Sequence, residues 1–280
     1  MSHTEFGSIE RPEIRHTSLW HQSVTIFRRN LIHIKRMPEM LLDVTIQPVM
    51  FVLLFAFVFG GSINVIGTPA GYREWLMAGI MGQTIAFASF IVAVGLTADL
   101  DKGIVDRMRS LPINPAAVLV GRSISSLMHS SIGIVIMSLT GLAIGWRIRD
   151  GFLEAVAAYA LLLMWGFTMI WLGILVGSTM RSVEAVNGLM FATMFPITFL
   201  ANTFAPTEKM PSGLRTIAEW NPLSSLVQAV RELWGNYPPM GDDAALPLQH
   251  PVLSTLIWTV GLTAILAPLA LRAFQRRTTT

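Results

Sequence analysis

The chain has 280 residues, of which 52% are hydrophobic and only 13% are charged, about half the charged share of an ordinary soluble domain. This composition indicates a large surface that never meets water, and the lack of cysteine excludes disulfides, thiolate nucleophiles and cysteine metal sites. The net charge is only +3, and the basic residues lie at the ends of apolar segments. We therefore expect a membrane protein with no nucleic-acid partner.

The first 36 residues divide into two parts. Residues 1–16 are polar, and we expect a flexible N-terminus without a cleaved signal peptide. Residues 17–36 place apolar side chains on one helical stripe and basic side chains off it, which predicts an amphipathic helix in the lipid headgroup region. A helix packed on protein is the alternative, but the basic side chains suit anionic lipid. The residues that define this interfacial helix are Trp20, Phe27, Arg28, Arg29, Lys35 and Arg36.

Residues 37–280 are predicted to form one transmembrane domain with six apolar segments. A helix needs about 20 apolar residues to cross the hydrocarbon core, and these segments are too long for ordinary core helices. Glycine recurs on one face of the second and of the fourth segment, which predicts close packing between helices. The predicted spans lie at about 44–60, 75–97, 116–144, 152–177, 185–205 and 252–271.

Lysine and arginine are unequally distributed between the two sides of this bundle. With a cytoplasmic N-terminus, 14 of the 20 lie on the inner side and the other six lie outside. Because cytoplasmic loops carry an excess of basic residues, both termini are predicted to be cytoplasmic. Arg147 and Arg149 run against this rule, and we expect Asp150 and Glu154 to neutralise them in part.

The inner loop after the second span carries a helical pattern. Gly103 predicts a turn at the end of that span. Ile104, Met108 and Leu111 then recur on one stripe, and Pro112 ends the pattern. We predict a short amphipathic helix on the cytoplasmic side.

The outer segment at about 206–250 carries a second helical pattern. Asn221 and Pro222 predict a helix N-cap and first helical position. An apolar stripe follows, and we expect it to pack on the outer ends of the spans or to dip into the membrane interface. The stripe consists of Leu223, Leu226, Val227, Val230 and Leu233.

Familiar catalytic patterns are missing from the sequence. There is neither a GxxxxGK[ST] phosphate loop nor an HExxH motif, and the six histidines have no metal-ligand spacing. No acidic residue lies in the middle of an apolar segment, which argues against a proton-coupled transporter or a channel with a charged ring. We expect no catalytic residue, metal or cofactor in this chain, and no pattern identifies substrate-binding residues.

The two patterned loops together resemble those of ABC-2 type permeases, in particular the daunorubicin-resistance DrrB-like branch. On the inner side the resemblance rests on Asp99, Gly103, Arg107, Leu111 and Pro112. On the outer side it rests on the segment 204–211, on Asn221-Pro222-Leu223, and on Arg231 and Gly235. It extends over nearly the whole chain.

The resemblance implies an ABC-2, or type V exporter, fold in a bacterial cytoplasmic (inner) membrane. Its cytoplasmic coupling helix would dock on a separate DrrA-like ATPase dimer, which would bind ATP and Mg²⁺. Its outer segment would form re-entrant or capping helices, and the second permease would be another copy or a DrrC-like chain. The coupling residues would be Asp99, Asp101, Gly103, Ile104, Arg107, Met108, Leu111 and Pro112, and those of the outer motif Pro206, Pro211, Asn221, Pro222 and Arg231.

The implied substrates are lipophilic, either an anthracycline-type drug or a complex envelope lipid such as phthiocerol dimycocerosate. The many methionine and phenylalanine residues favour such a substrate. Two alternatives stay open. One is a permease that exports polysaccharide or polyprenyl-linked glycan, and the other is a membrane-embedded enzyme or assembly protein, which would need clustered His, Asp or Glu at one membrane face.

Overall fold

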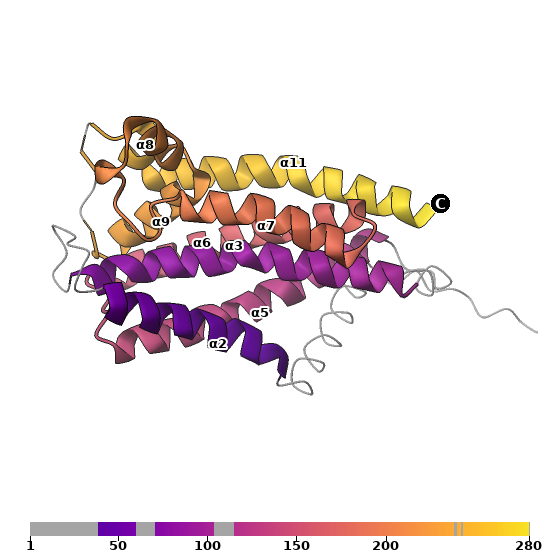
Figure 1. Cartoon of the computed structure of the whole chain (residues 1–280), viewed down its shortest axis with the longest axis horizontal. Helices are drawn as coiled ribbons and strands as arrows, with labels where there is room; N and C mark the ends of the chain where they lie inside the picture. Colours follow the sequence, from indigo (N-terminus) through magenta and orange to yellow (C-terminus); the bar gives the residue numbers. More distant parts are fainter. Residues whose placement is uncertain (1–38, 60–70, 104–114, 238–239, 242, 280) are drawn as a thin grey trace, which may run out of the picture.

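The computed structural model describes residues 39–59, 71–103, 115–237, 240–241 and 243–279, and every regular element in these ranges is helical. The helices form one elongated bundle, with α8 and α9 at one end and the C-terminus at the other (Figure 1). The elements are α2 (Glu39–Leu54), η1 (Phe55–Phe59), α3 (Tyr72–Asp101), α5 (Pro115–Ala143), α6 (Phe152–Thr179), α7 (Val183–Phe199), η2 (Thr207–Lys209), α8 (Ser212–Glu219), α9 (Pro222–Leu233), α10 (Leu246–Gln249) and α11 (Pro251–Thr279).

Each of the six predicted spans falls on one of these helices. Four of them, α3, α5, α6 and α11, are long and apolar enough to cross a membrane, whereas the apolar parts of the first and fifth, Ile46–Val58 and Val183–Phe199, are shorter. The predicted interfacial helix at 17–36 and the flexible segment at 1–16 lie outside the described residues.

The fifth predicted span, at about 185–205, extends beyond the end of its helix. The helix α7 ends at Phe199, and residues 200–205 are not helical. Ala201, Asn202 and Thr203 are nevertheless almost fully buried. This segment therefore stays inside the protein after the helix has ended, and the apolar run misplaced the boundary.

The pair α3 and α6 forms the centre of the bundle and makes the most extensive helix contact in it. A Cβ added at Gly173 would overlap the carbonyl oxygen of Ser89, and one at Gly177 would lie 2.7 Å from the carbonyl oxygen of Ala93. The two backbones therefore touch along the glycine face predicted on α6. The glycine face predicted on α3 packs elsewhere, because Gly79 lies against the backbone of Thr203 and Gly82 against Val227 of α9. Thr97 adds a hydrogen bond of 3.1 Å from its hydroxyl to the carbonyl oxygen of Gly177.

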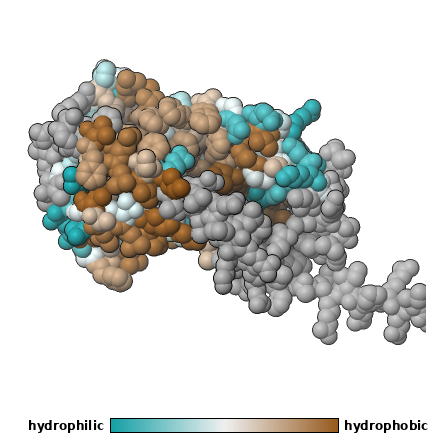
Figure 2. Space-filling model, turned by 60° about the horizontal axis from the view of Figure 1, so that its bottom comes forward, coloured by the Kyte–Doolittle hydropathy of each residue, from teal (hydrophilic) through white to brown (hydrophobic). Residues whose placement is uncertain are grey.

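The sides of the bundle are apolar and exposed. Leu139 on α5 and Ile257 and Val260 on α11 each expose more than 60% of their surface. Figure 2 shows hydrophobic side chains along the flank and hydrophilic ones gathered towards the two ends. A flank of this kind suits a lipid bilayer, because such extensive apolar exposure is unfavourable in water.

The close contact between α3 and α6 predicts a strong effect of one methyl group. Gly173→Ala should lower the melting temperature of the protein in lipid nanodiscs, because the backbone of α3 cannot rotate away and overpacking costs about 1–3 kcal/mol. Gly261→Ala is the matched control, since a Cβ at that helical glycine meets nothing within 4 Å. Equal melting temperatures for the two variants would contradict the described packing.

Candidate functional site

The predicted site residues that the structure describes lie at opposite ends of α3. Asp99, Asp101 and Gly103 lie at its C-terminal end, and the outer motif packs near its N-terminal end. The other residues assigned to coupling and to the interfacial helix lie outside the described ranges. They are Ile104, Arg107, Met108, Leu111 and Pro112, and Trp20, Phe27, Arg28, Arg29, Lys35 and Arg36.

Two aspartates tie the last turn of α3 to two other helices. Asp99 accepts a hydrogen bond of 2.5 Å from the guanidinium of Arg122 on α5. Asp101 pairs with Arg277 on α11 at 3.1 Å. Both pairs are partly exposed at the end of the bundle. The C-terminal end of α3 is therefore connected by charge to α5 and α11.

Arg277 also closes the end of α6. Its Nη1 atom donates to the carbonyl oxygens of Gly177 and Met180. The last carbonyl groups of a helix have no partner within that helix, and basic side chains commonly satisfy them. One arginine thus joins the ends of α3, α6 and α11.

Gly103 ends α3 as predicted. Its φ angle is +63°, in the left-handed region that glycine adopts without strain. Its N–H donates to the carbonyl oxygen of Leu100 at 3.1 Å, which caps the last turn. The chain leaves α3 at this glycine, two residues after Asp101, and continues into 104–114.

At the other end of α3, Arg231 is a fully buried cation. Its guanidinium donates to the carbonyl oxygens of Trp75 at 2.9 Å, Asn202 at 2.8 Å and Thr203 at 3.4 Å. The guanidinium carbon also lies 3.5 Å from the ring centre of Trp75, a cation–π contact. Arg231 therefore clamps α9, the start of α3 and the turn after α7 together.

The acceptors of Arg231 follow from the end of α7. Asn202 and Thr203 lie beyond the last helical turn, so their carbonyl groups need partners from elsewhere. Burial lowers the pKa of Arg231 to about 9, and the side chain stays charged at neutral pH. Within the described residues its hydrogen bonds go to carbonyl groups rather than to a carboxylate, which makes it a structural clamp for irregular backbone.

The helix α9 is held against the spans as its sequence predicted. Asn221 accepts a hydrogen bond from the N–H of Leu223 at 2.9 Å and is therefore the N-cap. Its side-chain amide also donates to the carbonyl oxygen of Ile197 near the end of α7, at 2.6 Å. Leu223, Val227 and the other apolar residues of the stripe pack against α3, α6 and α11.

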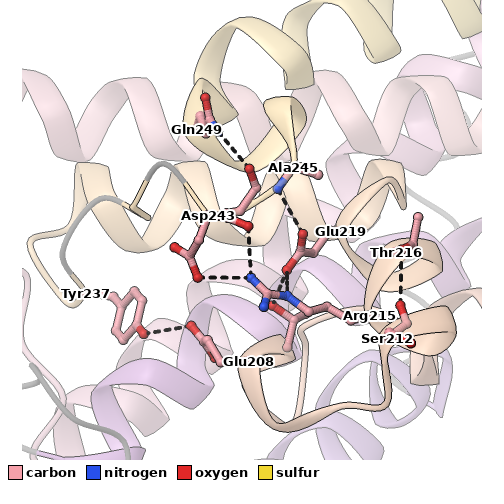
Figure 3. A network of polar contacts seen from close by, with 11 residues as sticks. Glu208, Ser212, Arg215, Thr216, Glu219, Tyr237, Asp243, Ala245 and Gln249 are labelled. Carbon is pink, nitrogen blue, oxygen red and sulfur yellow. Dashed lines mark hydrogen bonds and ion pairs between the residues drawn. The ribbon is translucent and has the colours of Figure 1, made fainter.

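A second polar network lies at the same end of the bundle, around α8 (Figure 3). Arg215 on α8 pairs with Glu219 at 2.6 Å and with Asp243 at 3.3 Å. Glu219 is almost fully buried and also accepts from the N–H of Ala245 at 2.9 Å. These bonds join α8 to the segment before α10. The predicted motif prolines stand at the start of two cap elements, Pro206 before η2 and Pro211 before α8.

The expected neutralisation of Arg149 by Asp150 and Glu154 is wrong. Arg149 instead forms a two-pronged bond with Glu74 in the first turn of α3, with distances of 2.8 to 3.0 Å. The Glu74 side chain is completely buried, so this pair fixes the loop before α6 onto α3. Glu74 is 75 residues away from Arg149 in the sequence. The one sequence signal for this pair was the position of Glu74 as an isolated acidic residue at the edge of an apolar segment.

Comparison with known proteins decides the family. The family model for ABC-2 type transporters matches residues 21–234. The chain belongs to the ABC-2 type transporter family. This match confirms the resemblance and makes the chain a permease, which is one subunit of a transporter complex and implies an ATPase partner and a membrane.

This ABC-2 permease is similar to drug resistance permeases and to a putative transport permease. It is 28% identical to the daunorubicin resistance ABC transporter permease protein DrrB1 of Streptomyces coeruleorubidus, over 91% of this chain and 86% of the relative. It is 24% identical to the probable doxorubicin resistance ABC transporter permease protein DrrC of Mycobacterium tuberculosis, over 84% and 81%. It is also 24% identical to the putative transport permease ycf38 of Porphyra purpurea, over 81% and 78%.

The buried clamp formed by Arg231 makes one substitution unusually costly. Arg231→Lys should lower the melting temperature, because one ammonium cannot reach the same carbonyl groups and stack on Trp75, and each buried group left without a partner costs about 1–3 kcal/mol. Tryptophan fluorescence during thermal unfolding measures the effect. Arg73→Lys, at an exposed arginine in the first turn of α3, should change the melting temperature little. A stable Arg231→Lys protein would show that the clamp is dispensable.

Proposed function

We propose that this permease forms the membrane pathway of an ATP-driven exporter for lipophilic compounds, either anthracycline-type drugs or complex envelope lipids such as phthiocerol dimycocerosate. The observation that carries the proposal is the similarity to the daunorubicin resistance permease, which extends over 91% of the chain. The doxorubicin resistance relative supports the same substrate class. The apolar flank and the methionine-rich interior suit a substrate that partitions into the bilayer.

We further propose six spans in a bacterial cytoplasmic (inner) membrane, with both termini in the cytoplasm. The helix from Glu39 to Phe59 covers 21 residues, which reach about 30 Å at roughly 1.5 Å per residue. Its apolar part is Ile46–Val58, and Glu39 and Asp43 would lie at the membrane surface. The helix α7 reaches only about 25 Å by the same measure, and the segment 200–205, of which Ala201, Asn202 and Thr203 are buried, would account for the remaining depth. The basic side chains Arg122 and Arg277 lie at the end proposed to be cytoplasmic.

The energy source is proposed to be a separate DrrA-like ATPase dimer that binds ATP and Mg²⁺. It would dock on the coupling helix predicted at 104–112, next to Asp99, Asp101 and Gly103. The second permease is another copy of this chain or a DrrC-like relative. The outer network of α8, α9 and α10 would cap the exit of the pathway.

The direct test is reconstitution of the complex in lipid nanodiscs. The permease and a DrrA-like ATPase from the same genome should co-purify, and daunorubicin should change the rate of ATP hydrolysis. An ATPase whose phosphate-loop lysine is substituted is the control and should remove the signal. A permease that purifies without the ATPase and gives no drug-dependent turnover would contradict the exporter assignment.

The proposed coupling helix makes a second prediction. Arg107→Glu should abolish drug efflux from cells while expression and membrane insertion stay normal, because a reversed charge would disturb docking on the ATPase. Arg272→Glu is the matched control, since Arg272 is an exposed basic residue of α11. Full efflux by the Arg107→Glu protein would refute the assignment of the coupling helix.

A further inference from the structure

Four charged residues at the inner end of the bundle connect three helices. Asp99 and Asp101 lie in the last turn of α3, and they bind Arg122 of α5 and Arg277 of α11. We call these four residues the inner clasp. The clasp lies just before Gly103, where the chain leaves α3 for the predicted coupling helix.

From this geometry we infer that the inner clasp transmits movement of the coupling segment to α5 and α11, so that its four residues are positioning residues for ATP-driven transport. The inference rests on the proposed function. It assigns the task to side chains of the spans themselves, which act on transport through the helices they join rather than by contact with substrate or ATP.

Each arginine of the clasp is held by a second contact besides its carboxylate. Arg122 lies against the backbone of α3, because a Cβ at Gly95 would come within 2.7 Å of its Nη2 atom. Arg277 donates to the carbonyl oxygens of Gly177 and Met180 at the end of α6. An ion pair whose arginine is fixed in this way keeps one geometry, so a shift of α3 must displace its partners as well.

Stability alone does not account for the clasp. Its side chains are 23–40% exposed, and ion pairs at a protein surface contribute only about 0–1 kcal/mol. The long contact between α3 and α6 already holds the core of the bundle. Yet α5 and α3 make far fewer contacts than α3 and α6 do. The pair of Asp99 with Arg122 therefore supplies a connection that packing provides only weakly.

The helix α7 lies outside this connection. It packs on α3 through a cluster that contains Ala93, Val186, Met190 and Met194. Within the described residues no ion pair joins α7 to α3 or α6. A displacement that enters at Gly103 is thus passed by charge to α5 and α11. The N-terminal part of α7 is held to α3 by apolar packing, so it can pivot about its C-terminal end, which Arg231 and Asn221 fix.

The test uses the permease–ATPase complex in proteoliposomes, with three readings on each variant: ATP hydrolysis, daunorubicin transport and melting temperature. The variants are Asp99→Arg, Arg122→Asp and the double exchange, which restores an opposite-charge pair in reverse order. Gly95→Ala is a further variant, because its methyl group displaces the Arg122 guanidinium without changing any charge. Arg272→Glu controls for a change of charge at this end of the bundle.

Each single reversal should lower drug transport per ATP hydrolysed by about tenfold, within the usual range for coupling between sites. ATP hydrolysis, co-purification and melting temperature should stay close to wild type. The double exchange should recover most of the transport, Gly95→Ala should show a partial loss, and Arg272→Glu should behave as wild type.

Two outcomes would overturn the inference. One is normal transport per ATP in the single reversals. The other is a loss of transport that follows a loss of folded protein and is not recovered by the double exchange, since this would give the clasp a purely structural role. If the wild-type complex itself shows no drug-dependent turnover, the proposed function fails instead, so the two failures are distinguishable.

Discussion

Backbone contact between α3 and α6 is the constraint on which the other features depend. It exists because Gly173 and Gly177 carry no side chain where the carbonyl groups of Ser89 and Ala93 approach. In a membrane the hydrophobic effect does not drive helices together, so close van der Waals contact must do so. With α6 fixed against it, α3 becomes a continuous central helix of 30 residues whose two ends carry the polar sites.

The two ends of α3 are built in different ways. At the N-terminal end of α3, Arg231 and Glu74 are fully buried, and they fix irregular backbone and a loop onto the first turn of the helix. At the C-terminal end of α3, the charges of the clasp are partly exposed and join helix ends to one another. A buried clamp resists movement, because opening it leaves charged and polar groups without partners. The partly exposed clasp is better suited to transmit a displacement of α3 to α5 and α11.

The sequence predicted those features that depend on neighbouring residues. Helical periodicity and hydropathy located all the long helices, the Asn221 cap and the buried stripe of α9, and Gly103 adopts the expected left-handed turn. The glycine faces on α3 and α6 were also visible, because a regular spacing of small residues is a local pattern.

The remaining features depend on residues that are distant in the sequence. The acceptor of Arg231 at Trp75 is 156 positions away, and Arg277 lies 176 positions from Asp101. No periodicity predicts such a pairing, so Arg231 was singled out only by resemblance and Arg277 not at all. The end of α7 was not predicted for a related reason, since Ala201, Asn202 and Thr203 are buried by other parts of the protein although they are not helical.

The most direct test of this account asks whether α3 and α6 stay together during the transport cycle. The chain has no cysteine, so spin labels can be attached at the exposed positions Lys102, Thr179 and Glu184 after substitution by cysteine. Pulsed electron–electron double resonance measures the distances between pairs of spin labels in the ATPase complex, first without nucleotide and then with trapped ATP. The account predicts an unchanged distance from Lys102, at the end of α3, to Thr179 on α6 and a changed distance from Lys102 to Glu184 on α7. A shift of several ångströms between Lys102 and Thr179 would contradict it.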